Sequence, residues 1–314
     1  MILKPQSRTE LSELLAGNFA SAERISKVDL SSVASLVEHQ PEDMTASADA
    51  GMTVRAFQQR LRESGQWLPI DPPNESITIG DLLAFDVSGS RRLGYGTIRD
   101  YLIGIRVAMA DGTVIKAGGK VVKNVAGYDL CKLFIGARHS IGIIVEGTFK
   151  LRPLPEKEGF LGLAVASMEE LEAARAKLWS SRAEPVMLDG YGDAGRIDLH
   201  AAFAGNREDV DAQIELARPL GFVEQEENRY AAQFWSGTAP KKISVLPSRT
   251  AQTLSELGAT QWLAHLGNGV IYYRGGKVRE NEGVPAELKN LMERVKNEFD
   301  PKGIFPNYDD DRSA

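Results

Sequence analysis

The sequence predicts an α+β protein of two domains followed by a final helix. Three observations lead to this prediction. Glycines punctuate the stretch 71–155, and the short apolar runs between them indicate buried strands. Segments with strand and helix patterns then follow in mixed order over 156–283, which is typical of a sheet with helices on one face. From Pro285 to Phe299 the apolar residues recur at helical spacing.

Composition excludes several classes of protein. A chain of 314 residues can bury a sizeable core and favours two domains over one. A net charge of −6 gives a role in nucleic-acid binding no electrostatic support. Cys131 is the single cysteine, which excludes a disulfide framework or a cysteine-ligated cluster within this chain. We expect Cys131 to act as a small buried hydrophobe.

Neither a metal site nor a membrane span is expected. The four histidines are scattered and lack the spacing of metal ligands; they are His39, His139, His200 and His265. No apolar run reaches the length of a membrane span, and the N-terminus lacks the apolar core of a signal peptide. The expected location is the cytoplasm, and peripheral attachment at the inner membrane through partners stays open.

The first 70 residues predict two helices with strands between them. Ser7 and Glu10 have the spacing of a capping box before a helix with a leucine stripe. Thr53 is expected to cap the second helix, which ends near Gly65. Between these helices, strand patterns lie at 27–30 and 35–38, and the segment 41–48 resembles a turn followed by a strand. Asp-Pro-Pro at 71–73 then imposes an extended entry to the glycine-rich stretch.

Within the glycine-rich stretch, strands are expected at 103–110, 113–117 and 141–151. The dipeptide Asp111-Gly112 is a strong signal for a hairpin between the first two. In the following domain we expect strands at 160–166, 186–188, 197–203, 243–246, 261–266 and 270–274. Helices are expected from a capping box at Ser167 and Glu170, and over 206–220 and 248–257.

The glycine-rich stretch could cradle a large cofactor that bears phosphate. Backbone amides and small side chains are available at 79–80, 88–89, 95–96 and 141–144. The alternative is that these glycines only serve turns. The turn explanation is favoured for any single glycine, whereas a ligand is favoured for the crowded set. Neither the Rossmann fingerprint nor the P-loop pattern occurs.

Several polar groups stay open to two interpretations. A polar cluster could hold a loop against the cofactor, meet an acidic partner, or form a solvated loop; its members are Lys120, Lys123, Asn124, Tyr128 and Asp129. Arginines at 91, 92 and 99 could balance phosphate charge, or Arg99 could form a structural ion pair with Asp100. His265 could be a general base, although a structural role is favoured.

Several short motifs resemble the FAD-binding domain of the vanillyl-alcohol oxidase/p-cresol methylhydroxylase (VAO/PCMH) superfamily. They are Thr78-Ile79-Gly80, Ser88-Gly89, the segment 95–100, Asp111-Gly112 and the segment 122–130. The string Lys-Asn-Val-Ala-Gly-Tyr-Asp-Leu at 123–130 is similar to that of the E subunit of bacterial glycolate oxidase and its relative, D-lactate dehydrogenase. The ending at 299–305 resembles the superfamily's C-terminal return to the FAD domain.

The resemblance implies an FAD domain of two subdomains over 1–155, a cap or substrate domain over 156–284, and a C-terminal return over 285–314 with an acidic tail. It implies FAD as cofactor and oxidation of a 2-hydroxy acid, glycolate or D-lactate. It also implies a homologous flavin subunit and an iron–sulfur subunit as partners. The positions that match the family's FAD contacts are Pro73, Thr78, Ile79, Gly80, Ser88, Gly89, Gly96, Thr97, Gly142 and Ile144. The catalytic residues stay unassigned.

The sequence also departs from the superfamily pattern. The region 14–31 has only Gly17 where the family carries a glycine-rich pyrophosphate loop. Asp81 replaces the second glycine of a Gly-Gly pair, and Arg138 and His139 add bulk to a glycine-rich turn. These departures motivate an alternative function, that of a non-catalytic scaffold subunit with a degenerate FAD site.

Overall fold

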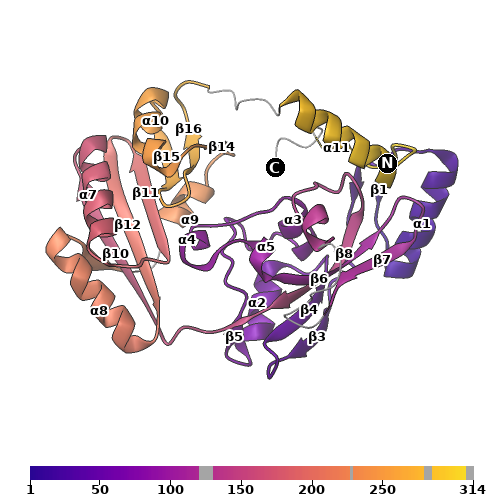
Figure 1. Ribbon diagram of the computed structural model, residues 1–314, viewed down its shortest axis with the longest axis horizontal. Coiled ribbons are helices and arrows are strands. Elements are labelled where there is room, and N and C mark those ends of the chain that lie inside the picture. Colours follow the sequence, from indigo (N-terminus) through magenta and orange to yellow (C-terminus); the bar gives the residue numbers. More distant parts are fainter. Residues whose placement is uncertain (120–129, 227–228, 279–284, 309–314) are drawn as a thin grey trace. The chain divides into compact units, whose positions relative to one another are not determined.

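A computed structural model describes residues 1–119, 130–226, 229–278 and 285–308 (Figure 1). The chain divides into two compact units. The first comprises Met1–Ser88, Thr97–Leu154 and the C-terminal segment, and the second comprises Gly89–Gly96 and Pro155–Gly283. Both units combine helices with a sheet, which confirms the predicted α+β class.

The first unit is built on an antiparallel sheet in the order β3-β4-β8-β6-β7. Its strands are β3 (Leu36–Gln40), β4 (Thr45–Asp49), β6 (Leu102–Ala108), β7 (Val114–Gly118) and β8 (Ile143–Lys150). The predicted hairpin at Asp111-Gly112 is confirmed, because β6 and β7 pair antiparallel across it. Two strand pairs lie beside this sheet: β1 (Ile2–Leu3) with β2 (Lys27–Val28), and β5 (Gln66–Trp67) with β9 (Arg152–Pro153).

Three longer helices belong to the first unit: α1 (Arg8–Ser21), α2 (Val54–Arg62) and α11 (Ala286–Phe299). The predicted N-caps are confirmed, since Ser7 accepts from the Glu10 amide and Thr53 from the Ala56 amide. Short helices that the sequence did not predict also occur: α3 (Ile79–Ala84) and α5 (Ile98–Tyr101). A further short helix, α6 (Cys131–Phe134), contains Cys131, which is buried as predicted.

The C-terminal segment packs into the core of the first unit. Ile304 and Phe305 are fully buried together with Leu11, Leu15 and Val145. The final helix is confirmed as α11, but Pro285 occupies its N-cap instead of the expected first helical position. Two leucines of its apolar side, at 288 and 291, are about half exposed.

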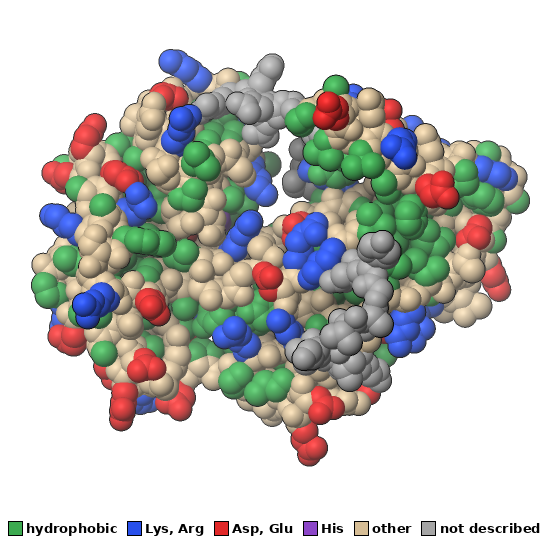
Figure 2. Space-filling model, viewed as in Figure 1, with side chains coloured by type: hydrophobic (Ala, Val, Ile, Leu, Met, Phe, Trp, Pro, Cys, Tyr) green, Lys and Arg blue, Asp and Glu red, His purple; other side chains and the backbone are tan. Residues whose placement is uncertain are grey.

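The second unit holds an antiparallel sheet in the order β13-β10-β12-β11-β15-β16-β14. The strands are β10 (Lys157–Val165), β11 (Met187–Asp193), β12 (Arg196–Gly205), β13 (Val223–Gln225), β14 (Lys241–Ser244), β15 (Gln261–His265) and β16 (Val270–Arg274). Three α-helices contribute residues to one hydrophobic core of this unit: α7 (Met168–Ser180), α8 (Arg207–Ala217) and α10 (Thr250–Leu257). Two 3₁₀ turns also occur, η1 (Arg218–Leu220) and η2 (Pro247–Arg249). Acidic and basic side chains lie interspersed over the face of this unit that Figure 2 shows.

The expectation that helices cover one face of this sheet is only partly right. Residues that alternate along β15 belong to different cores: Trp262 packs with α7, α8 and α10, whereas Leu263 packs with Phe234 of α9 (Arg229–Trp235). The unpredicted helix α9 therefore packs on the opposite face. The same alternation along β12 places Asp198 and His200 on the α9 face.

The segment 89–96 contains the short helix α4 (Arg92–Tyr95) and packs on β11. The Gly94 amide donates to the Val186 carbonyl at 3.1 Å. A Cβ at Gly94 would lie 2.6 Å from the Val186 Cα, so only glycine permits this approach. In the part of the chain that the structure describes, no helix is long and apolar enough to cross a membrane.

Candidate functional site

The start of α3 is held tightly against the end of β4. Thr78 caps the helix by accepting from the Asp81 amide at 3.1 Å. The Gly80 amide donates to the Ala50 carbonyl at 2.8 Å, and a Cβ at Gly80 would lie 3.0 Å from the Ala50 Cβ. Gly80 is thus required by close packing within the protein, and its amide is already used. Ala50 in turn donates to the carbonyl of Val145, next to the predicted site residue Ile144.

The turn at 136–142 packs on the same helix. The Gly136 and Arg138 amides donate to carbonyls of α3 at 2.9 and 2.8 Å. The imidazole of His139 meets Asp81, with 3.2 Å between Nε2 and Oδ1. Burial alone would raise the pKa of the Asp81 carboxyl, but the hydrogen bond and charge of His139 outweigh burial and lower that pKa below its ordinary value. Asp81 and His139, two of the residues that depart from the family pattern, are therefore partners.

Arg99 ties the segment after α3 to the segment after α6. Its Nε donates to Asp86 Oδ2 at 3.1 Å, and its terminal nitrogens donate to the carbonyls of Lys132 and Ile135. Of the two interpretations left open for Arg99, a structural ion pair is the one seen, but its partner is Asp86 and not Asp100. Asp100 instead accepts from the amide of Thr97 at 2.7 Å and completes a capping box at the start of α5.

Three buried polar atoms in the first unit have no hydrogen-bond partner among the described residues. They are Oδ1 of Asp86, Oγ of Ser88 and Nδ1 of His139. Asp86 lies against the 136–142 turn, within 3.5 Å of a Cβ built at Gly136. Buried polar groups in proteins are nearly always hydrogen-bonded, so these three atoms fit a polar ligand such as FAD, whose hydroxyls and ring edges both donate and accept.

The predicted FAD contacts divide between the two units. Gly89 and Gly96 belong to the second unit, and the remaining eight belong to the first. Thr78, Ile79, Gly80 and Ile144 lie together around the junction of α3, β4 and β8. Gly142 precedes β8, where a Cβ would lie 2.6 Å from Val107. Pro73 lies in the loop before α3. The predicted polar cluster at 120–129 lies outside the described residues.

The second unit contains a buried polar network centred on Asp189 of β11, which is fully buried. Its Oδ1 lies 2.8 Å from Nδ1 of His265, and its Oδ2 accepts from Ser90 and from the Tyr230 hydroxyl at 3.0 Å. Ser90 and His265 both contact the Asp189 carboxylate. The His265 nitrogen that lies near the Ser90 hydroxyl is Nδ1, which is the nitrogen that contacts Asp189. This geometry is not that of an activated serine nucleophile. It supports the structural role that the sequence favoured for His265.

Arg91, for which the sequence allowed a role in balancing phosphate charge, forms a bidentate ion pair with Glu158 of β10. Its side chain is only 12% exposed, so this pairing occupies its charge within the second unit. Arg92 is exposed at the start of α4, and nothing in the structure assigns it a ligand.

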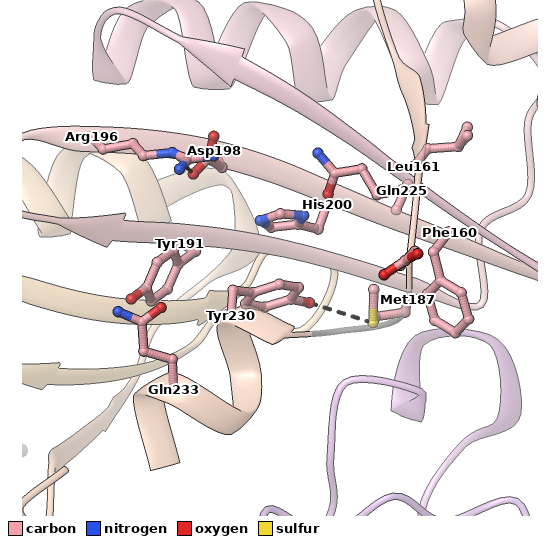
Figure 3. A pocket seen from close by; sticks show the side chains of 12 residues that line it. Phe160, Leu161, Met187, Tyr191, Arg196, Asp198, His200, Gln225, Tyr230 and Gln233 are labelled. Carbon is pink, nitrogen blue, oxygen red and sulfur yellow. Dashed lines mark hydrogen bonds and ion pairs between the residues drawn. The ribbon is translucent and has the colours of Figure 1, made fainter. Parts of the chain in front are cut away.

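A cavity of about 390 Å³ opens on the α9 face of the second unit (Figure 3). Residues of β10, β11, β12 and β13 line it together with α9. The ring of His200 stacks on Tyr230, with centroids 3.8 Å apart and planes 9° from parallel. Burial lowers the pKa of His200 below its ordinary value, although the charges of Asp198 and Asp189 and a hydrogen bond with Gln225 oppose that effect. This cavity was not predicted from the sequence, although polar residues alternate along β12.

Comparisons with known proteins show what this chain is similar to. Residues 8–118 match the family model described as an FAD binding domain. Glycolate oxidase subunit GlcE of Escherichia coli is 27% identical over 86% of this chain and 83% of its own length. Glycolate oxidase subunit GlcD of Bacillus subtilis is 38% identical over 44% of this chain. D-lactate dehydrogenase of Archaeoglobus fulgidus is 31% identical over 45% of it.

The extent of these matches differs. The chain covers 29% of the GlcD protein and 33% of the D-lactate dehydrogenase. Among solved structures, an alkyldihydroxyacetonephosphate synthase aligns over 96% of this chain with a TM-score of 0.75 and 17% identity. That structural likeness shows the fold alone.

Proposed function

We propose that this chain, a member of the VAO/PCMH-type FAD-binding superfamily, is a GlcE-like FAD-binding subunit that supports oxidation of a 2-hydroxy acid, glycolate or D-lactate. The observation that carries the proposal is the match to GlcE, which extends over most of both chains. The GlcD and D-lactate dehydrogenase matches support the same substrate class, since both proteins are named for 2-hydroxy acids.

The residues of the first unit fit the cofactor. Ser88, Asp86 and His139 each carry a buried polar atom without a partner among the described residues, and we propose that FAD supplies the missing hydrogen bonds. Of the predicted contacts, Gly80 and Gly142 would shape the cradle by allowing close packing, and Thr78 by capping α3. When bound, a flavin accepts a hydride from the carbon that bears the substrate hydroxyl.

We further propose a complex with a homologous flavin subunit and an iron–sulfur subunit. The names GlcD and GlcE denote separate subunits of glycolate oxidase, which supports an assembly of several chains. The single cysteine of this chain requires that an iron–sulfur relay belong to another subunit. The proposed location is the cytoplasm, with attachment at the inner membrane through such partners.

The alternative, a scaffold with a degenerate FAD site, is not favoured. It was motivated partly by Asp81 and His139, which the structure pairs with each other. A Gly80→Trp variant would not separate the alternatives, because any side chain at Gly80 meets Ala50 and disturbs packing. The flavin content of the assembled complex separates them directly. The proposal requires more FAD than the partner flavin subunit binds by itself, whereas a scaffold adds none.

The activity is tested by co-expressing this chain with its flavin and iron–sulfur partners and measuring dye reduction by glycolate and D-lactate. We expect turnover with at least one of these acids, and its loss when this chain is omitted. Equal rates with and without the chain, in preparations with matched partner content, would overturn the proposed function.

A further inference from the structure

The cavity of the second unit has the properties of a separate small-molecule site. Its volume of about 390 Å³ lies within the range of ligand pockets, roughly 300–1,000 Å³. The side chains that line it come from four neighbouring strands and from α9, and they mix aromatic with polar groups (Figure 3). None of the predicted FAD contacts is among them.

His200 supplies the polar group that most needs a ligand. The residue is 6% exposed, lies amid the lining side chains, and has an Nε2 without a hydrogen-bond partner among the described residues (Figure 3). Burial disfavours its charged form, so the imidazole is neutral near pH 7 and offers one donor and one acceptor. A buried ring nitrogen without a partner is costly, and a ligand group that hydrogen-bonds to it would remove that cost.

The orientation of His200 is fixed by the residues behind it. Its ring stacks on Tyr230, and the Tyr230 hydroxyl donates to the fully buried Asp189. Asp189 is itself held by His265 and Ser90. The stacked pair is therefore anchored through a buried carboxylate to β11 and β15. Such support presents a binding group in one geometry, which is a general requirement of a specific site.

The charges in the cavity select against an anionic ligand. Arg196 is the one cation among the described lining residues, and its Nε is already paired with Asp198 at 2.6 Å. Glu226 adds a second carboxylate. A ligand carboxylate would therefore meet two like charges and a guanidinium already paired.

The remaining polar groups suit hydroxyls. Carboxylates accept hydrogen bonds, whereas the amides of Gln225 and Gln233 both donate and accept. Gly162 leaves the space that the Gln225 amide fills, since a Cβ there would lie 2.1 Å from Nε2 of Gln225. The faces of Tyr191 and Phe160 supply apolar walls. Hydroxyl groups on a carbon skeleton match this combination, because each can donate to one wall and accept from another.

We propose that this cavity binds an uncharged polyhydroxylated molecule, of the polyol or small-sugar class, with a hydrogen bond between a ligand hydroxyl and Nε2 of His200. The inference goes beyond the proposed function. It concerns a second ligand, and its test needs neither flavin nor turnover.

The test uses the full chain labelled with ¹⁵N-histidine and titrated with methyl β-D-glucopyranoside, with glycolate as the anionic comparison. We expect the glucoside to shift the His200 imidazole resonances in a saturable manner, and glycolate to leave them unchanged. Absence of a shift with the glucoside, or a shift at lower concentrations of glycolate, would overturn the proposal.

Variants make the test specific to His200. His200→Phe keeps a flat ring on Tyr230 but removes Nε2, and we expect at least about tenfold weaker glucoside binding by saturation-transfer NMR. Tyr230→Phe should weaken glucoside binding less than His200→Phe does. In the Tyr230→Phe variant, the His200 resonances should differ from those of the wild type, because the ring at position 230 no longer donates to Asp189. Gln252→Ala on α10 is the matched surface control. Unchanged glucoside binding by the folded His200→Phe variant would contradict the inference.

Discussion

Substitution of Ser88 tests whether this residue contacts a ligand or has a purely structural role. Its Oγ is buried and has no partner among the described residues. We predict that Ser88→Ala weakens FAD binding by about two- to twelvefold, the effect of one hydrogen bond of roughly 0.5–1.5 kcal/mol. The free energy of unfolding of the FAD-free chain should stay the same or rise, because an unsatisfied buried hydroxyl is removed.

Calorimetric titration with FAD and urea unfolding measure the two quantities. Ser21→Ala, at the exposed end of α1, is the control for loss of a serine hydroxyl. If Ser88→Ala binds FAD as tightly as the wild type does, the assignment of Ser88 to the cofactor is wrong.

His200 predicts a pH dependence of stability. Its pKa is lowered in the folded chain by burial, whereas the unfolded side chain titrates near its ordinary value of about 6.5. Below that pH the unfolded state binds the proton more readily, so the folded state loses stability as pH falls from about 6.5 towards the lowered pKa. His200→Phe should lose less stability than the wild type between pH 7.5 and 5.5 when both are unfolded by urea. Parallel losses in the two proteins would show that His200 does not titrate in this way.

At the scale of elements, two glycines test opposite effects of the same substitution. Gly94→Ala would place a Cβ 2.6 Å from the backbone of Val186 and push α4 away from β11. We predict a loss of about 1–3 kcal/mol in the free energy of unfolding, the usual cost of overpacking. Gly17→Ala, within α1 and with no atom within 4 Å of the new Cβ, should instead gain roughly 0.5–1 kcal/mol. Urea unfolding of both variants gives the comparison, and a neutral Gly94→Ala would mean that α4 is not held by this contact.

Elements whose determinants are local in sequence were predictable. The helices α1, α2 and α7 begin at the serine or threonine caps read from the sequence, because cap and first turn lie within four residues. Helices α3, α4 and α9 were missed because four to seven residues are too few to display a helical period. The strand alternation along β12 is visible in sequence, but the position of α9 on that face depends on tertiary packing.

In the candidate sites too, features set by local sequence were predictable and features set by tertiary packing were not. Thr78, Ser88 and Gly142 could be named from a family resemblance, which transfers positions without geometry. The pairing of Arg99 with Asp86 in place of Asp100, and of His139 with Asp81, depends on how separate turns pack. The stack of His200 on Tyr230 joins residues thirty positions apart in sequence, from β12 and α9. No spacing rule within a single element predicts such a contact.

At the scale of the whole molecule, the proposed function depends on FAD binding by this chain. The most direct measurement is the visible absorption spectrum of the purified full chain, before and after incubation with FAD and removal of the excess. We predict that the protein retains the two absorption bands of an oxidised flavin, and that Ser88→Ala retains less flavin after the same washing. A wild-type chain that stays folded by circular dichroism but colourless after this treatment would contradict the claim.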